Sequence, residues 1–254
     1  MAKKIFITIT CLFIGLSVIF YVSQYDKVVS LTDTKETTKE PVKKEVKKEV
    51  KKEKKQKKLP GNVNDWELLL VNEQHKIKEE PKNLKELPDG HKVDSRIYDS
   101  YLSLVDGAKK AGFELTVISA YRSVAEQEAI VERDTEENLY QGVPEDEAKE
   151  KAMEYLTVPG LSEHHTGLAL DVLDVNWYQE GKMLEEGFGE TEAGKWLGEN
   201  ACHYGFIIRY QKGKEKITGI NYEPWHIRYV GKENAEYMTK NHLVLEEYVD
   251  QLKK

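Results

Sequence analysis

The sequence predicts an α+β domain, in which helices flank a mainly antiparallel sheet, behind an N-terminal apolar segment and a charged linker. Runs rich in β-branched and aromatic residues alternate with amphipathic segments, but not in the regular strand–helix–strand order of a parallel sheet. Hydrophobic residues make up 39% of the 254 residues and charged residues 33%, which suits one soluble domain with a polar extension. We therefore divide the chain into an apolar segment at 1–25, a linker at 26–60 and a folded domain at 61–254.

The N-terminal segment has the pattern of an export signal. Lys3 and Lys4 precede an unbroken apolar run from Ile5 to Val22, whose length borders on that of a membrane span. The small-x-small cleavage pattern is poorly matched after this run, so we expect a retained membrane anchor, or a secreted protein if the segment is cleaved. The basic residues ahead of the run predict that the rest of the chain lies outside the cytoplasm.

The linker has the composition of a solvated, disordered tether. Residues 35–58 contain twelve Lys and five Glu and carry a net charge of +7, although the whole chain carries −7. So few apolar residues cannot bury a core. A second interpretation is that the positive charge follows an anionic surface, such as the membrane or wall polymers. Nucleic-acid binding is not expected, because the segment lacks aromatic residues and should lie outside the cell.

Within the domain, capping residues and a proline mark where four of the expected helices begin. Asp94 and Ser123 can cap the first two helices, the third follows Pro144, and Thr191 opens the fourth. The expected helices cover residues 94–110, 123–133, 145–155 and 191–203, with two more starting at 232 and 245. The expected strands are the runs of β-branched and aromatic residues at 66–71, 115–119, 168–173, 205–210, 217–220 and 225–230.

Two short segments hold the parts of a catalytic metal site. The first reads P-G-L-S-E-H-H-T-G-L-A-L-D and offers His164, or its neighbour His165, together with Asp171. The second reads E-P-W-H and places Glu223 three residues before His226. Two imidazoles and a carboxylate can hold Zn²⁺ with one position open for water, and Glu223 would be the general base that accepts the proton of that water.

The local sequence explains how these side chains reach a common site. Gly167 lets the first segment bend back toward the strand that follows it. In that strand, alternate apolar residues face the core, whereas Ala169 and Asp171 share the opposite face, where the small Ala169 leaves space beside a metal. Proline lacks a backbone donor, so we expect Pro224 to keep Glu223 off the sheet ladder and free to turn toward the site.

Three motifs carry a family resemblance. The stretch S-E-H-H-T-G-L-A-L-D follows the pattern S-x-H-x-x-G-x-A-x-D, E-P-W-H-I-R-Y-V-G contains the glutamate and the second histidine, and S-A-Y-R-S at 119–123 lies upstream of both. In this order they resemble the motifs of VanY-type D-alanyl-D-alanine carboxypeptidases, over roughly Trp66 to the C-terminus. The wider group also contains L,D-carboxypeptidases, lysostaphin-like peptidases and the hedgehog signalling domain, which implies an α+β zinc scaffold.

When the family's functional residues are transferred to the matching motif positions, the resemblance implies that one zinc ion is bound by His164, Asp171 and His226. It assigns the catalytic base to Glu223 and makes His165 a bystander, a choice that spacing alone leaves open.

The resemblance also implies a set of substrate contacts. Arg122 would hold the scissile carbonyl oxygen and stabilise the oxyanion. Gln127 and Ser162 are similar to positions that line the substrate pocket, and Tyr210 would close that pocket over the terminal D-alanine. The alternatives are ordinary structural roles: an ion-paired arginine, a helix-face glutamine, a capping serine and a packed tyrosine.

The function that the resemblance implies is a monomeric zinc carboxypeptidase that removes the C-terminal D-alanine from peptidoglycan stem peptides, at the outer face of a bacterial membrane. An L,D-carboxypeptidase that acts on tetrapeptide stems is an alternative, since the same zinc centre serves both reactions and only the substrate pocket distinguishes them. A third interpretation is a non-catalytic wall-binding module with a structural zinc. Glu223 argues against it, because a structural site has no use for a base beside an open coordination position.

Overall fold

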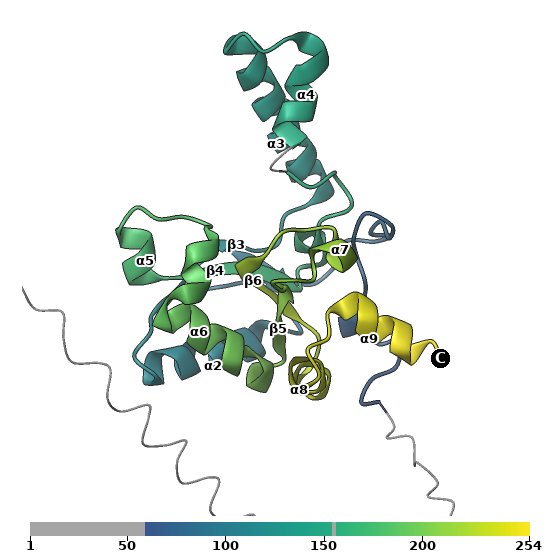
Figure 1. The fold of residues 1–254 in the computed structure, drawn as a ribbon, viewed down its shortest axis with the longest axis vertical. Coiled ribbons are helices and arrows are strands. Elements are labelled where there is room, and N and C mark those ends of the chain that lie inside the picture. Colours follow the sequence, from purple (N-terminus) through teal and green to yellow (C-terminus); the bar gives the residue numbers. More distant parts are fainter. Residues whose placement is uncertain (1–58, 154–155) are drawn as a thin grey trace, which may run out of the picture. The chain divides into compact units, whose positions relative to one another are not determined.

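The computed structural model describes residues 59–153 and 156–254 (Figure 1). The membrane anchor and the tether up to residue 58 that the sequence predicts lie outside these residues. Within the described part of the chain, none of the helices has the length and apolar character needed to cross a membrane.

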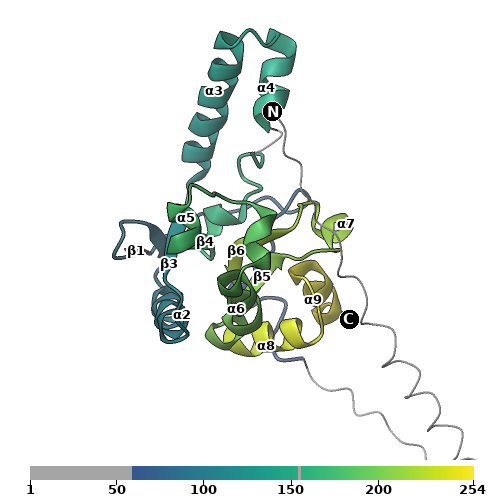
Figure 2. The same cartoon turned by 60° about the vertical axis from the view of Figure 1, so that its left-hand side comes forward.

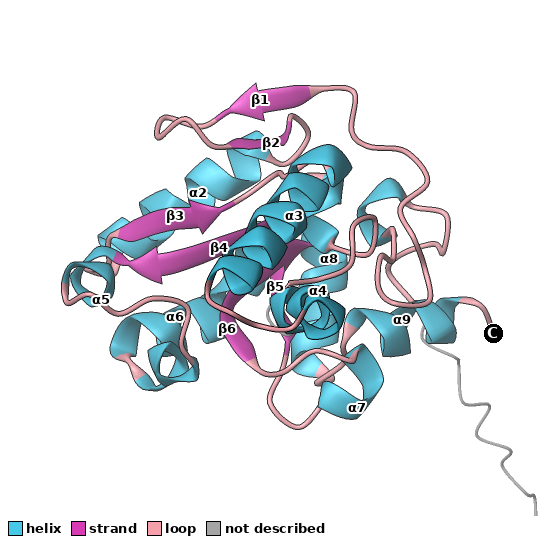
Figure 3. Ribbon diagram, turned by 90° about the horizontal axis from the view of Figure 1, so that it is seen from above, coloured by secondary structure: helices cyan, strands magenta, loops and turns pink. Residues whose placement is uncertain are grey.

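A four-stranded sheet forms the centre of the domain, with the strand order β3-β4-β6-β5. All three neighbouring pairs are antiparallel, which confirms the predicted fold class. Two short strands, β1 and β2, form a separate antiparallel pair that runs alongside the sheet (Figure 3). The strands are β1 (Leu84–Glu86), β2 (Lys92–Asp94), β3 (Leu115–Ser119), β4 (Ala169–Asp174), β5 (Phe206–Tyr210) and β6 (Glu223–Tyr229).

Helices α2, α6 and α8 lie together on one side of the sheet (Figure 1). In α2, Leu104 and Ala108 are fully buried at helical spacing, in the same core as Leu170 and Ile227 of the sheet. A second apolar cluster joins α8 and α9 to the strand residue Ile207. The bounds are α2 (Tyr98–Lys110), α5 (Val175–Gln179), α6 (Glu192–Asn200), α7 (Glu215–Thr218), α8 (Lys232–Lys240) and α9 (Leu245–Leu252).

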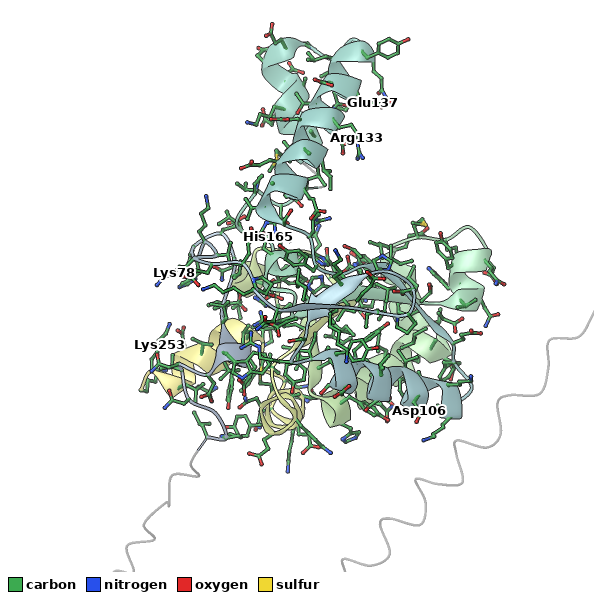
Figure 4. All side chains as sticks on the ribbon, turned by 180° about the vertical axis from the view of Figure 1, so that it is seen from behind. Lys78, Asp106, Arg133, Glu137, His165 and Lys253 are labelled. Carbon is green, nitrogen blue, oxygen red and sulfur yellow. The ribbon has the colours of Figure 1, made fainter. Side chains whose placement is uncertain are left out.

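Helices α3 (Val124–Tyr140) and α4 (Glu145–Met153) form a hairpin that projects from the rest of the domain (Figure 2). Ser123 caps α3 as predicted, in a capping box with Glu126. The helix runs past residue 133, where the sequence suggested an end, because its outer turns are polar and carry no apolar stripe that periodicity could detect. Figure 4 shows Arg133 and Glu137 far out along this hairpin.

Two expected strands are wrong. Residues 66–71 begin with a 3₁₀ helix, η1 (Trp66–Leu68), and continue without a strand. Leu68 and Val71 are buried, whereas Leu69 between them is exposed. Residues 217–220 fall on the end of α7 and a turn in which Gly219 takes a left-handed conformation, with φ 76°. The other 3₁₀ helices in the described residues are η2 (Glu163–Thr166), η3 (Glu186–Glu190) and η4 (Ala201–Tyr204).

Two glycines of α6 allow a test of its packing. A Cβ on Gly194 would collide with the carbonyl oxygen of Phe188, whereas a Cβ on Gly198 would meet nothing within 4 Å. We expect Gly194→Ala to lower the free energy of unfolding by roughly 1–3 kcal/mol, because the backbone must move. Gly198→Ala should raise it by up to about 1 kcal/mol through helix propensity. Urea denaturation of both variants measures these changes, and equal effects would contradict the close approach at Gly194.

Candidate metal centre

The pairing of β4 with β6 brings the first two site residues together. In this antiparallel pair Asp171 lies directly opposite His226, so both side chains leave the same face of the sheet. The neighbouring pair, Leu170 and Ile227, is fully buried on the opposite face. The predicted alternation of β4 is therefore confirmed, although the whole strand is buried because both of its faces are covered.

The third residue comes from η2, immediately before β4. His164 Nε2 lies 3.2 Å from Asp171 Oδ2, and His226 Nδ1 lies 2.9 Å from Asp171 Oδ1. The two imidazole rings meet edge to face, with their centroids 5.0 Å apart. All three side chains are buried, and one ligand atom from each lies within 4.8 Å of the others. Of the described residues, these three form the group that can hold a metal ion.

The chemistry of this donor set fits Zn²⁺. Two imidazoles and a carboxylate supply three ligands and leave a coordination position open. The surroundings also favour a cation. Burial would lower the pKa of His226, but the hydrogen bond to Asp171 and the nearby carboxylate of Glu163 outweigh burial and raise that pKa to about 10. A metal ion would take the place of the proton on the ring nitrogen that faces Asp171.

The structure groups His164, and not His165, with Asp171. The Nδ1 atom of His164 donates to the carbonyl oxygen of Ala120 at 2.8 Å, which leaves Nε2 as the free lone pair facing Asp171. Both ring nitrogens of His165 are used elsewhere: Nδ1 donates to the Arg122 carbonyl at 2.7 Å and Nε2 accepts from the Gly160 amide at 3.0 Å. His165 therefore links the backbone of residue 122 to that of residue 160, close to where the α3–α4 hairpin joins the domain (Figure 4).

Gly167 makes the turn that joins η2 to β4. Its φ is 65°, in the left-handed region, and a Cβ at this position would lie 2.8 Å from the backbone nitrogen of Asp94. The same close approach allows the Asp94 amide to donate to the Gly167 carbonyl at 3.0 Å. Glycine is thus required both by the turn and by the neighbouring strand, as expected for a loop that bends back.

Glu223 lies beside the three ligands, but not by the predicted route. It belongs to β6 and pairs with Tyr210, so Pro224 does not keep it off the ladder. A register shift between Ile208 and Tyr210 accommodates Pro224, which has no backbone N–H to donate to β5. Oε2 of Glu223 lies 3.7 Å from His226 Nδ1. Burial raises the pKa of Glu223 to about 7, with His226 opposing the shift, which is a suitable value for a group that accepts and returns a proton.

The predicted substrate contacts lie around this centre in different settings. Arg122 follows β3, is half-buried, and its Nε has no partner in the part of the chain that the structure describes. The ring centroid of Tyr210 lies 4.9 Å from that of His226. Ser162 Oγ accepts from the His164 amide at 3.3 Å and caps η2. Gln127 is fully buried, and its Nε2 donates to the Thr157 carbonyl at 2.7 Å.

Sequence reasoning missed a buried ion-pair network behind the metal centre. Glu163 bridges two fully buried arginines, Arg209 of β5 and Arg228 of β6, and Arg209 continues to Glu246 of α9. Burial would raise the pKa of Glu163, but the charges of the two arginines hold it well below its usual range. A signal was available: I-R-Y occurs in both strands, and an arginine within a buried strand needs an acidic partner.

Comparison with known proteins identifies the family. Residues 90–232 match the family model described as VanY: D-alanyl-D-alanine carboxypeptidase. The chain belongs to this family. It is 40% identical over 196 residues to the Bacillus subtilis protein YodJ, with 77% of this chain and 65% of that protein covered. It is 36% identical over 194 residues to a D-alanyl-D-alanine carboxypeptidase of Enterococcus faecalis, with 76% and 69% covered. The chain thus spans a little under two thirds of the first relative's length.

Solved structures of related proteins share the fold. A VanY mutant from a VanB-type resistance cassette, in complex with Zn(II), is 37% identical with a TM-score of 0.60, covering 73% of this chain and 99% of that chain. VanYB in complex with D-alanine-D-alanine is 36% identical with a TM-score of 0.61, covering 73% and 98%. The LdcB LD-carboxypeptidase is 38% identical with a TM-score of 0.63, covering 78% and 94%.

The two adjacent histidines provide a test of the metal ligands. We expect His164→Ala to lose most of the bound zinc, because it removes one of three ligands. His165→Ala is the matched control and should keep its zinc, since both of its ring nitrogens contact the backbone. Elemental analysis of the two purified variants after dialysis measures the zinc content. Full zinc in His164→Ala with loss in His165→Ala would show that the wrong histidine was assigned.

Proposed function

We propose that this protein is a zinc-dependent carboxypeptidase that removes the C-terminal D-alanine from peptidoglycan stem peptides. The observation that carries the proposal is the convergence of His164, Asp171 and His226 in a buried cluster with Glu223 beside it. Family membership supports it, and so do the relatives named as D-alanyl-D-alanine carboxypeptidases and the related structure with D-alanine-D-alanine.

In this proposal, the two imidazoles and the carboxylate hold one zinc ion. When bound, the ion supplies positive charge that acidifies a water molecule and polarises the scissile carbonyl. Hydrogen bonds orient the ligands for this role. His164 is held by the carbonyl oxygen of Ala120, and Asp171 lies between the two histidines.

Glu223 moves the proton. Its carboxylate accepts a proton from the water that attacks the carbonyl carbon, so that a new carbon–oxygen bond forms. It then delivers that proton to the amine nitrogen of the departing D-alanine as the carbon–nitrogen bond breaks. A pKa near neutrality allows both steps, since the group must hold the proton briefly and release it. This role distinguishes the proposal from a wall-binding module with a structural zinc.

Arg122 stabilises the charge that develops on the carbonyl oxygen. It is half-buried beside the centre, and its Nε has no partner among the described residues. A partly buried guanidinium with a donor to spare can bind an oxyanion strongly. Burial lowers the pKa of Arg122 and the charge of Asp171 opposes that shift, so the centre and the arginine already interact.

The substrate pocket is built from the residues around the ligands. We assign Tyr210, whose ring lies against His226, to the wall that closes over the terminal D-alanine. Ser162 Oγ and Gln127 Nε2 contact the backbone of their own chain. The two residues would shape the pocket through Ser162 Oγ and through Gln127 Oε1, which has no hydrogen-bond partner among the described residues.

One observation favours a second candidate, an L,D-carboxypeptidase that acts on tetrapeptide stems. The LdcB LD-carboxypeptidase has the same fold at 38% identity, and it covers slightly more of this chain than the two VanY structures do. Both candidates require the same ligands, base and arginine. They differ in the residue that precedes the scissile bond. Incubation of the protein with pentapeptide and tetrapeptide stems, followed by mass spectrometry of the products, tests the choice: release of D-alanine from the pentapeptide supports the first candidate, and release from the tetrapeptide alone supports the second.

The placement of the enzyme in the cell is part of the proposal. The apolar run at 5–22 would anchor the chain in the membrane and the Lys/Glu-rich linker would extend the domain, as a monomer, toward the wall on the extracytoplasmic side. A solvated linker suits an enzyme whose substrate is a polymer fixed outside the membrane.

The role of Glu223 can be separated from metal binding. Glu223→Gln keeps the shape of the side chain but cannot accept the proton, so kcat should fall by about 10²–10⁴-fold while zinc content stays normal. Glu233→Gln, in the exposed first turn of α8, is the matched control and should keep full turnover. Steady-state kinetics on a D-alanine-terminated pentapeptide, with zinc analysis, give the result. Normal turnover in Glu223→Gln would show that Glu223 is not the general base.

The role of Arg122 shows in how its loss divides between kcat and KM. Arg122→Lys keeps the charge but loses the planar fork, so kcat should fall by roughly 10²–10³-fold with a smaller rise in KM, because the contact strengthens in the transition state. Arg133→Lys, on the exposed outer part of α3, is the control. A rise in KM with unchanged kcat would instead mean that Arg122 only holds the substrate.

A further inference from the structure

Glu163 is next to His164 in the chain but takes no part in the proposed ligand set. Its side chain is fully buried, with no exposed surface. One carboxylate oxygen, Oε1, accepts from Arg209 Nε at 2.7 Å and from Arg228 Nη1 at 2.7 Å. Two charge-assisted hydrogen bonds on one oxygen fix both the charge and the orientation of this carboxylate.

The two arginines are themselves held in place. Arg209 donates through both terminal nitrogens to Glu246, at 2.9 Å and 2.6 Å. Arg228 donates through Nη2 to the carbonyl oxygens of Glu67 and Leu69, at 3.0 Å and 2.7 Å. The carboxylate of Glu163 is therefore set in a rigid frame that reaches from η1 to α9.

The second oxygen of this carboxylate points at the metal centre. Glu163 Oε2 has no hydrogen-bond partner in the described residues and lies 3.6 Å from His226 Nε2, which is also buried and without one. The other ring nitrogen, His226 Nδ1, faces Asp171. An imidazole that binds a metal through Nδ1 carries its proton on Nε2, and a shift of under about 1 Å would bring that proton into a hydrogen bond.

We propose that Glu163 is the positioning residue of the metal centre: its Oε2 accepts the Nε2 proton of His226, which fixes the tautomer and presents Nδ1 to the metal. This inference rests on the ligand set of the proposed function. A carboxylate behind a ligating imidazole fixes the ring and makes it a stronger donor. His164 has only the carbonyl oxygen of Ala120 in the corresponding place, so His226 is the ligand that the protein strengthens most.

The test compares two glutamates of the same network. Glu163→Gln removes the acceptor charge behind His226, whereas Glu246→Gln removes a charge from Arg209 without touching His226. In the full-length chain, with zinc affinity measured by competition against a chelating indicator, we expect Glu163→Gln to bind zinc about 10–100-fold more weakly. Glu246→Gln should stay within about twofold of the unmodified protein, and kcat on the pentapeptide should fall in Glu163→Gln with KM little changed.

A second measurement needs no variant and is independent of folding defects. In the zinc-loaded protein labelled with ¹⁵N-histidine, NMR should show the His226 proton on Nε2, shifted downfield by the carboxylate. A proton on Nδ1 would overturn the proposal, as would unchanged zinc affinity in Glu163→Gln or equal losses in Glu163→Gln and Glu246→Gln. Failure of the unmodified protein to bind zinc would instead refute the proposed function, so the two failures can be distinguished.

Discussion

The antiparallel pairing of β4 with β6 is the interaction on which the site depends. It sets Asp171 opposite His226, and a slip of one residue would turn His226 to the other face of the sheet. The register is held from that other face by Leu170 and Ile227, which are fully buried in the core. Packing of apolar side chains on one face of the sheet therefore determines the geometry of the polar centre on the other.

Much of this arrangement could be predicted from the sequence. The strands at β3, β4, β5 and β6 were found within two residues of their ends, because runs of β-branched and aromatic residues mark them. Two short segments offered His164 or His165, Asp171 and His226, with Glu223 nearby, and the family resemblance then implied His164. Spacing could not separate His164 from His165; that choice depends on which ring nitrogen is used by the backbone, a fact of the folded loop.

The features that escaped prediction depend on partners distant in sequence. Trp66 and Ile217 belong to runs of strand-like composition, but Trp66 lies in η1 and Ile217 in α7. The ring of Trp66 stacks on that of Tyr229, with the centroids 5.8 Å apart. Arg209 and Arg228 look like ordinary strand residues until both meet Glu163, 46 and 65 residues away in the chain. The sequence placed Glu223 correctly beside the ligands but predicted that it leaves the sheet. Glu223 instead stays paired in the sheet, where a register shift between β5 and β6 accommodates Pro224.

The α3–α4 hairpin is inserted between two parts of one site. It leaves the domain just after Arg122 and returns just before His164, and the Arg122 amide donates to the His164 carbonyl at 3.3 Å. The bond from Gln127 to the carbonyl of Thr157 closes the base of the insertion. The position of Arg122 relative to His164 therefore does not depend on the length of the hairpin. A change in the length of this arm would leave the arginine in place relative to the histidine, so relatives of this chain need not share the spacing between their first two motifs.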